Sequence, residues 1–220
     1  VSDPAEFVWF ALAGALIAMV MVLSLGGGNA ANPTRLVLAG AAVSALFVAV
    51  TRALLLLNQQ TLDTYRYWVL GGFDGLTFGT MATLLPFFFA GALLAGIGAL
   101  SLNALALGTD VARSLGLRVT LAQLIVIAAV VVLSAATVAM AGPIAFVGLV
   151  VPHLARGLAG VDMRWTAAFA VPIGAGLMVV ADLLGRLALF GGNLQAGVMA
   201  AMLGGPALIF LARRADRARR

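Results

Sequence analysis

The chain has 220 residues, of which 63% are hydrophobic and 10% are charged, and its formal net charge is +5 at pH 7. Ordinary soluble domains are about 45–50% apolar and about 25% charged, so this composition excludes a soluble enzyme and indicates a polytopic membrane protein. The sequence contains no cysteine, which excludes disulfides and thiolate metal sites within it.

Long apolar runs predict the membrane-spanning helices. A helix needs about 20 apolar residues to cross about 30 Å of hydrocarbon, and six runs meet this length. They are residues 7–25, 34–57, 78–102, 119–140, 165–187 and 194–212. Residues 144–154 are apolar but cover only half a membrane, so a short or re-entrant helix is predicted there. We therefore predict an all-α transmembrane bundle of about six long spans and one half-span, forming a single domain over residues 1–220.

Two polar stretches interrupt this pattern. Residues 58–77 carry several aromatic and charged side chains, which is typical of the headgroup region, and are predicted to form an interfacial loop. Residues 103–117 contain Asp110 and Arg113 between glycines. Their composition predicts a pair of short helices lying across the membrane axis and offering charges to a soluble partner.

The arginines predict the orientation of the chain. Five of them lie in the last eight residues: Arg213, Arg214, Arg217, Arg219 and Arg220. We interpret this cluster as a topology signal and not as a nucleic-acid-binding surface, because basic residues mark cytoplasmic segments of membrane proteins. A cytoplasmic C-terminus places residues 110–118 and 153–164 on the same side, and residues 58–77 and 186–195 on the opposite side.

A few ionisable residues need individual explanations. Asp182 lies four residues before Arg186, so a local ion pair is expected. His153 is expected to be a hydrogen-bonded helix-end residue, because one imidazole makes no metal site. Arg52 could reach the interface or line an aqueous path, and both interpretations stay open. The sequence has no P-loop, His-rich cluster or nucleophile elbow, so we expect no catalytic residue, no bound metal and no cofactor.

Several motifs, in order along nearly the whole chain, resemble the FecCD/BtuC-type permeases of ABC importers for iron-siderophores, haem or cobalamin. They lie at residues 67–73, 105–117, 141–156, 181–186 and 204–206. The opening helices of the family pattern are not seen, so a fragment or a truncated member is expected.

The resemblance implies a function in transport and not in catalysis. It implies a homodimer in the bacterial cytoplasmic (inner) membrane, in contact with lipid, with cytoplasmic ABC ATPase subunits that bind ATP and an extracytoplasmic substrate-binding protein. The binding protein would dock at Arg186. Coupling to the ATPase would involve Leu107, Gly108, Asp110, Ala112, Arg113 and Gly116. A structural or gating motif would comprise Gly142, Pro143, Phe146, Gly148, Pro152, His153, Arg156 and Asp182.

Two other functions stay open at this point. A secondary transporter driven by an ion gradient would need a functional ionisable group within the membrane, and Asp182 is the candidate for it. A truncated remnant without transport activity is the third hypothesis. Which chelate is carried does not follow from the residues.

Overall fold

The computed structural model describes residues 4–27, 33–187 and 194–217, and in these ranges every regular element is a helix. This confirms the predicted all-α class. The helices are α1 (Pro4–Leu25), α2 (Pro33–Leu55), α3 (Gln59–Val69), α4 (Phe78–Ala106), α5 (Thr109–Ser114), α6 (Val119–Ala141), α7 (Val147–Ala159), α8 (Met163–Arg186) and α9 (Ala196–Arg217).

Within the described residues, five helices are long and apolar enough to cross a membrane: α1, α2, α4, α6 and α8. At 1.5 Å per residue the 13-residue α7 extends only about 20 Å, so the predicted half-span is a short helix. The sixth predicted span coincides with α9, whose described apolar segment, Ala196–Ile209, is shorter than a full span. Arg52 lies in the last turn of α2 with an exposed side chain.

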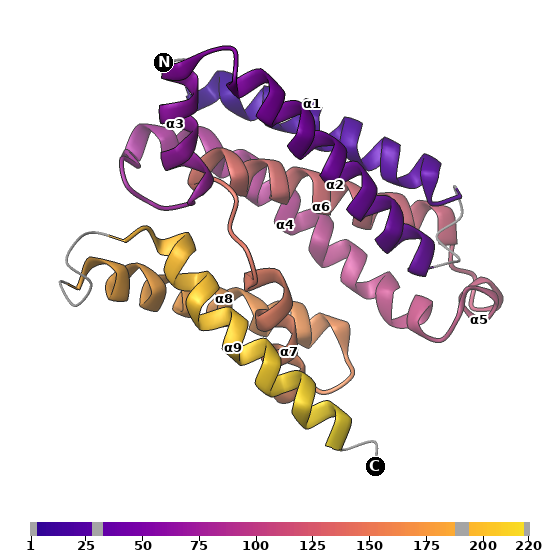
Figure 1. Ribbon diagram of the computed structural model, residues 1–220. Helices are drawn as coiled ribbons and strands as arrows, with labels where there is room; N and C mark the ends of the chain where they lie inside the picture. The colour runs from indigo at the N-terminus through magenta and orange to yellow at the C-terminus, as the bar shows by residue number, and fades with distance from the viewer. Residues whose placement is uncertain (1–3, 28–32, 188–193, 218–220) are drawn as a thin grey trace.

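The helices form two groups (Figure 1). In the first, α1 contacts α2 and α6, and α4 packs most extensively against α6. The α4–α6 contact is close because α4 has glycine where it meets α6, and a Cβ on Gly98 would lie only 2.9 Å from a Val126 methyl. In the second group α7, α8 and α9 pack together around Ala181, Met199 and Ala200. A contact between α4 and α8 joins the two groups.

The predicted loop at residues 58–77 is partly helical, because α3 occupies Gln59–Val69. The Asn58 side chain accepts a hydrogen bond from the Thr61 amide at 3.1 Å and thereby caps the first turn. The polar and aromatic composition indicated an interfacial position but concealed the helix. The loop prediction was therefore wrong for these eleven residues.

The predicted pair of short helices at residues 103–117 is a single short helix, α5, because residues 103–106 complete the last turn of α4. Gly108 separates the two helices with a φ of +105°, a conformation that glycine adopts without steric cost.

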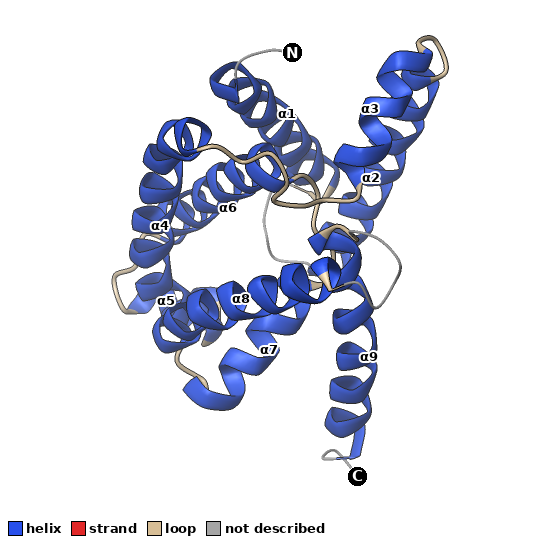
Figure 2. Ribbon diagram, turned by 90° about the vertical axis from the view of Figure 1, so that its left-hand side faces the viewer, coloured by secondary structure: helices blue, strands red, loops and turns tan. Residues whose placement is uncertain are grey.

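The ends of the helices lie at two opposite faces of the bundle. The C-terminal end of α2, α3 and the start of α4 lie at one face, and α5 lies at the other (Figures 1 and 2). The C-terminal end of α9 lies at the same end of the second helix group as the α7–α8 turn (Figure 1). The side chains of the arginine-rich tail lie outside the described residues.

Candidate functional site

One candidate site is the turn that carries α5. The Arg113 Nη1 donates to the Asp110 Oδ1 at 3.1 Å, and the two side chains remain 65% and 94% exposed. Gly108 and Gly116, with φ of +105° and +82°, reverse the chain on either side. The short helix therefore presents a pair of opposite charges to the surroundings of the bundle.

The same helix and the residues that flank it also expose apolar side chains. Leu107, Val111 and Leu115 are 66%, 45% and 67% exposed, whereas Ala112 is fully buried. Ala112 therefore anchors α5 from within and offers no surface to a partner. Exposed apolar side chains beside charged ones are typical of a surface that binds another protein.

A polar clamp joins α4 to the start of α8. The Asn103 Nδ2 donates to the Asp162 Oδ1 at 2.7 Å, and the Met163 amide donates to the Asn103 Oδ1 at 2.8 Å. The Arg164 amide also donates to the Asp162 carboxylate, at 2.9 Å. Asn103 and Asp162 thus satisfy two of the backbone donors that a helix N-terminus leaves without intrahelical partners.

These hydrogen bonds lower the pKa of Asp162, with the Asn103 amide as the largest cause and the Arg164 backbone amide next. Sequence reasoning assigned no role to this pair. Asp162 immediately before an apolar run is a signal for a helix N-cap, but nothing in the sequence pairs it with a residue 59 positions away.

The opposite end of α8 carries a second charged cluster. The predicted Asp182–Arg186 pair is confirmed, with the Arg186 Nε donating to the Asp182 Oδ2 at 2.8 Å. The Arg186 Nη2 also lies 3.4 Å from the Asp74 Oδ1, so Arg186 links α8 to the loop between α3 and α4. Its side chain stays 54% exposed.

Three backbone segments meet beside this cluster and form a crossing: the end of α3 with the residues after it (68–72), the end of α6 (141–143) and the start of α9 at Gly197. The Gly72 amide donates to the Ala141 carbonyl at 2.8 Å, and the Gly197 amide donates to the Gly71 carbonyl at 2.9 Å. Gly142 ends α6 with a φ of 70° and a ψ of −173°, and a Cβ on it would lie 2.5 Å from the Trp68 carbonyl oxygen. Such a conformation is essentially restricted to glycine, so this crossing requires Gly142.

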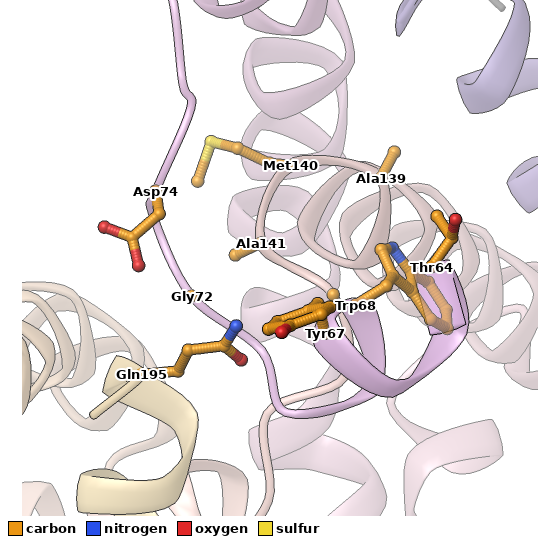
Figure 3. A pocket seen from close by; sticks show the side chains of 10 residues that line it. Thr64, Tyr67, Trp68, Gly72, Asp74, Ala139, Met140, Ala141 and Gln195 are labelled. Carbon is orange, nitrogen blue, oxygen red and sulfur yellow. The ribbon is translucent and has the colours of Figure 1, made fainter. Parts of the chain in front are cut away.

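A cavity of about 550 Å³ opens beside the crossing (Figure 3). Its walls come from α3, the α3–α4 loop, the end of α6 and the residue before α9. They are formed by Thr64, Tyr67, Trp68, Gly72, Asp74, Ala139, Met140, Ala141, Gly142 and Gln195. The buried Gln195 Oε1 has no hydrogen-bond partner among the described residues.

The remaining residues of the predicted gating motif lie along α7 and the linker before it. Phe146 begins α7 in the left-handed region with a φ of 65°, and its Cβ fits against Gly204 of α9, where a Cβ would lie only 2.6 Å away. Pro152 lies inside α7, and the His153 Nδ1 donates to the Leu149 carbonyl at 2.8 Å. His153 is therefore hydrogen-bonded, as expected, but near the middle of α7.

Three further motif residues differ in their surroundings. The Pro143 carbonyl oxygen faces Gly71 at the crossing, where a Cβ on Gly71 would lie 2.6 Å from it. Gly148 has open space around it, and Arg156 lies exposed in the last turn of α7. The structure therefore places Gly142, Pro143 and Phe146 at close contacts. It leaves Gly148, His153 and Arg156 exposed on α7.

Comparison with known proteins shows the family of the chain. The pattern of the FecCD transport family matches residues 2–214. The chain is 40% identical over 219 residues to the ferric enterobactin transport system permease protein FepD of Escherichia coli (strain K12), covering 98% of this chain and 65% of FepD. It is 36% identical over 208 residues to the Fe(3+) dicitrate transport system permease protein FecC of the same organism, covering 94% of this chain and 63% of FecC.

A solved structure gives the same result for the fold. It is an inward-facing conformation of a metal-chelate type ABC transporter, which matches with a TM-score of 0.74 and 25% identity over 94% of this chain and 65% of that one. The chain thus spans less than two thirds of the length of each of these proteins. Because the pattern of the FecCD transport family covers residues 2–214, this chain belongs to that family.

Proposed function

We propose that the chain is the membrane-spanning permease part of an ABC importer that moves a bulky metal chelate, with a ferric siderophore as the first candidate substrate and haem or cobalamin as the others. The observation that carries this proposal is the placement of the α5 surface and the Arg186 cluster at opposite ends of the bundle. The similarity to FepD, whose name gives ferric enterobactin, favours a siderophore.

The proposal assigns a partner to each face. Cytoplasmic ATPase subunits, which would bind the ATP themselves, dock on α5 through Asp110, Arg113 and the exposed leucines. An extracytoplasmic binding protein docks at Arg186, and two permease copies form a homodimer around the substrate path. Residues 1–220 form one domain of the inner-membrane permease, the C-terminus is cytoplasmic, and the permease needs no cofactor of its own. The arginine-rich tail supports this orientation.

Reconstitution tests the function directly. The complete permease is placed in proteoliposomes with its ATPase and binding protein, and uptake of radiolabelled ferric siderophore, haem and cobalamin is measured with ATP or with a proton or sodium gradient alone. We expect uptake of one chelate class with ATP and none with a gradient. Gradient-driven uptake that Asp182→Asn abolishes while ATP hydrolysis continues would instead establish a secondary transporter.

Reversing the charge of Arg186 is expected to weaken binding-protein association. Arg186→Glu places like charges at the docking surface, so the association rate should fall about tenfold at low ionic strength, and the difference should shrink as salt rises. Surface plasmon resonance on the reconstituted permease measures this rate. Arg186→Lys keeps the charge and should bind nearly as the parent does.

The matched control is Arg66→Glu, because Arg66 is an exposed arginine of α3 that also pairs with an acidic residue, Asp63, at 3.4 Å. It changes the net charge of the permease equally and should leave the association rate within about twofold of the parent. Equal association rates for Arg186→Glu and the parent at low salt would show that Arg186 is not part of the docking surface.

A further inference from the structure

The Asn103–Asp162 clamp lies where the two helix groups meet. Its hydrogen bonds of 2.7 and 2.8 Å connect residues 59 and 60 positions apart and reinforce the α4–α8 contact. Both side chains are part-buried beside long apolar helices. An amide–carboxylate hydrogen bond in such surroundings is stronger and more directional than the exposed pairs elsewhere on the chain.

Asp162 is committed to the start of α8 as well as to Asn103. Its carboxylate accepts from the Arg164 amide at 2.9 Å, and its backbone carbonyl accepts from the Thr166 hydroxyl at 2.9 Å. Asn103 in turn accepts from the Met163 amide. The first turn of α8 is therefore held by a side chain of another helix. A shift of α8 along its axis would break the two hydrogen bonds that Asn103 makes with Asp162 and Met163.

Asn103 is also one turn from the end of α4, which leads directly into α5. From the clamp, the 24 residues of α8 extend about 36 Å to the Arg186 cluster at the opposite face. The end of α4, the clamp and α8 thus connect the charged surface of α5 with the cluster formed by Asp74, Asp182 and Arg186, with Gly108 between α4 and α5 and Pro172 inside α8.

We propose that Asn103 is a positioning residue whose clamp on Asp162 and Met163 makes α5 and α8 move as one body. A displacement that the ATPase imposes on α5 then reaches the Arg186 face through α8. This inference rests on the proposed function, because it assigns the route by which ATP hydrolysis is coupled to transport.

A charge exchange between the two residues tests the route. In the complete permease assembled with its ATPase and binding protein, Asn103→Asp places two carboxylates against each other. The amount of chelate imported per ATP should fall at least tenfold, while ATP hydrolysis stays within about twofold of the parent. Asp162→Asn keeps a helix cap and a hydrogen-bond acceptor for Asn103. In this variant the amount of chelate imported per ATP should fall no more than about threefold.

The double variant Asn103→Asp with Asp162→Asn restores one carboxylate and one amide with their roles exchanged. The amide at position 162 can donate to the carboxylate at position 103, which still accepts from the Met163 amide. The ratio of transport to hydrolysis should recover to within about twofold of the parent. A purely destabilising effect would lower the amount of assembled permease and leave this ratio unchanged.

Two results would overturn the inference. One is a parental transport-to-hydrolysis ratio in the Asn103→Asp variant, and the other is a double variant that assembles normally but stays as uncoupled as Asn103→Asp. If the parent itself shows no ATP-dependent uptake, the proposed function has failed instead. In that case amide hydrogen exchange tests the clamp by itself. If the clamp exists, the Met163 amide exchanges faster in the Asn103→Ala variant than in the parent. Equal exchange rates of this amide in the two proteins would rule the clamp out.

Discussion

Replacing Gly142 by alanine is expected to lower the free energy of unfolding by at least about 2 kcal/mol and to remove most of the folded permease from the membrane. Gly142 has a φ of 70° and a ψ of −173°, and the new Cβ would lie 2.5 Å from the Trp68 carbonyl oxygen. An L-residue in this backbone region costs on the order of 1–3 kcal/mol, and the contact with a backbone oxygen adds to it.

Gly148→Ala is the matched control, because Gly148 belongs to the same motif but lies inside α7 with no heavy atom within 4 Å of a Cβ built on it. Alanine in a helix interior is more favourable than glycine by about 0.5–1 kcal/mol, so this variant should be unchanged or slightly stabilised. Thermal unfolding of the two purified permeases in detergent compares them. Equal midpoints would show that the crossing tolerates a Cβ at position 142.

Reversing a charge on α5 is expected to reduce substrate uptake at least tenfold without preventing membrane insertion. Asp110 and Arg113 are exposed and pair with each other, so Asp110→Arg or Arg113→Glu should barely affect folding. On a docking surface, however, a reversed charge meets like charge on the ATPase, at a cost of several kcal/mol. Uptake and ATP hydrolysis are measured together in proteoliposomes that contain equal amounts of permease.

The bundle supplies a matched control for α5 in the exposed i,i+3 pair of Asp63 and Arg66 on α3. Asp63→Arg changes the net charge equally at the opposite face and should leave uptake per ATP unchanged. The double variant Asp110→Arg with Arg113→Asp restores the local ion pair but reverses the charge pattern. We expect substrate uptake by this double variant to stay as low as in the single variants. Uptake at the parental level would mean that the pair serves only the stability of α5.

The spans and the local ion pair could be predicted because both are determined by neighbours in the sequence. An apolar run of about 20 residues has few alternatives to a membrane-spanning helix, and Asp182 and Arg186 share a face of any helix that contains both. The loop prediction failed for Gln59–Val69 because aromatic and charged side chains obscured a helix whose signal was the Asn58 cap.

Contacts between distant segments could not be predicted in the same way. Asn103 meets Asp162 across 59 positions, and Arg186 meets Asp74 across 112 positions. One polar residue in an apolar helix does not identify its partner, and a glycine does not indicate which backbone approaches it. The motif around Gly142 was found in the sequence, but its reason, the crossing beside Trp68 and Gly71, became visible only in the structure.

The side of the membrane on which α5 lies decides whether it can dock on a cytoplasmic ATPase. Because these 220 residues contain no cysteine, Ser114→Cys in α5 and Gln60→Cys in α3 each introduce one thiol among them. Any cysteine elsewhere in the complete permease is replaced by serine. We expect a membrane-impermeant maleimide to label position 114 only from the cytoplasmic side and position 60 only from outside, and we expect position 114 to crosslink to the ATPase. Labelling of position 114 from the exterior, or no crosslink to the ATPase, would contradict the proposed function.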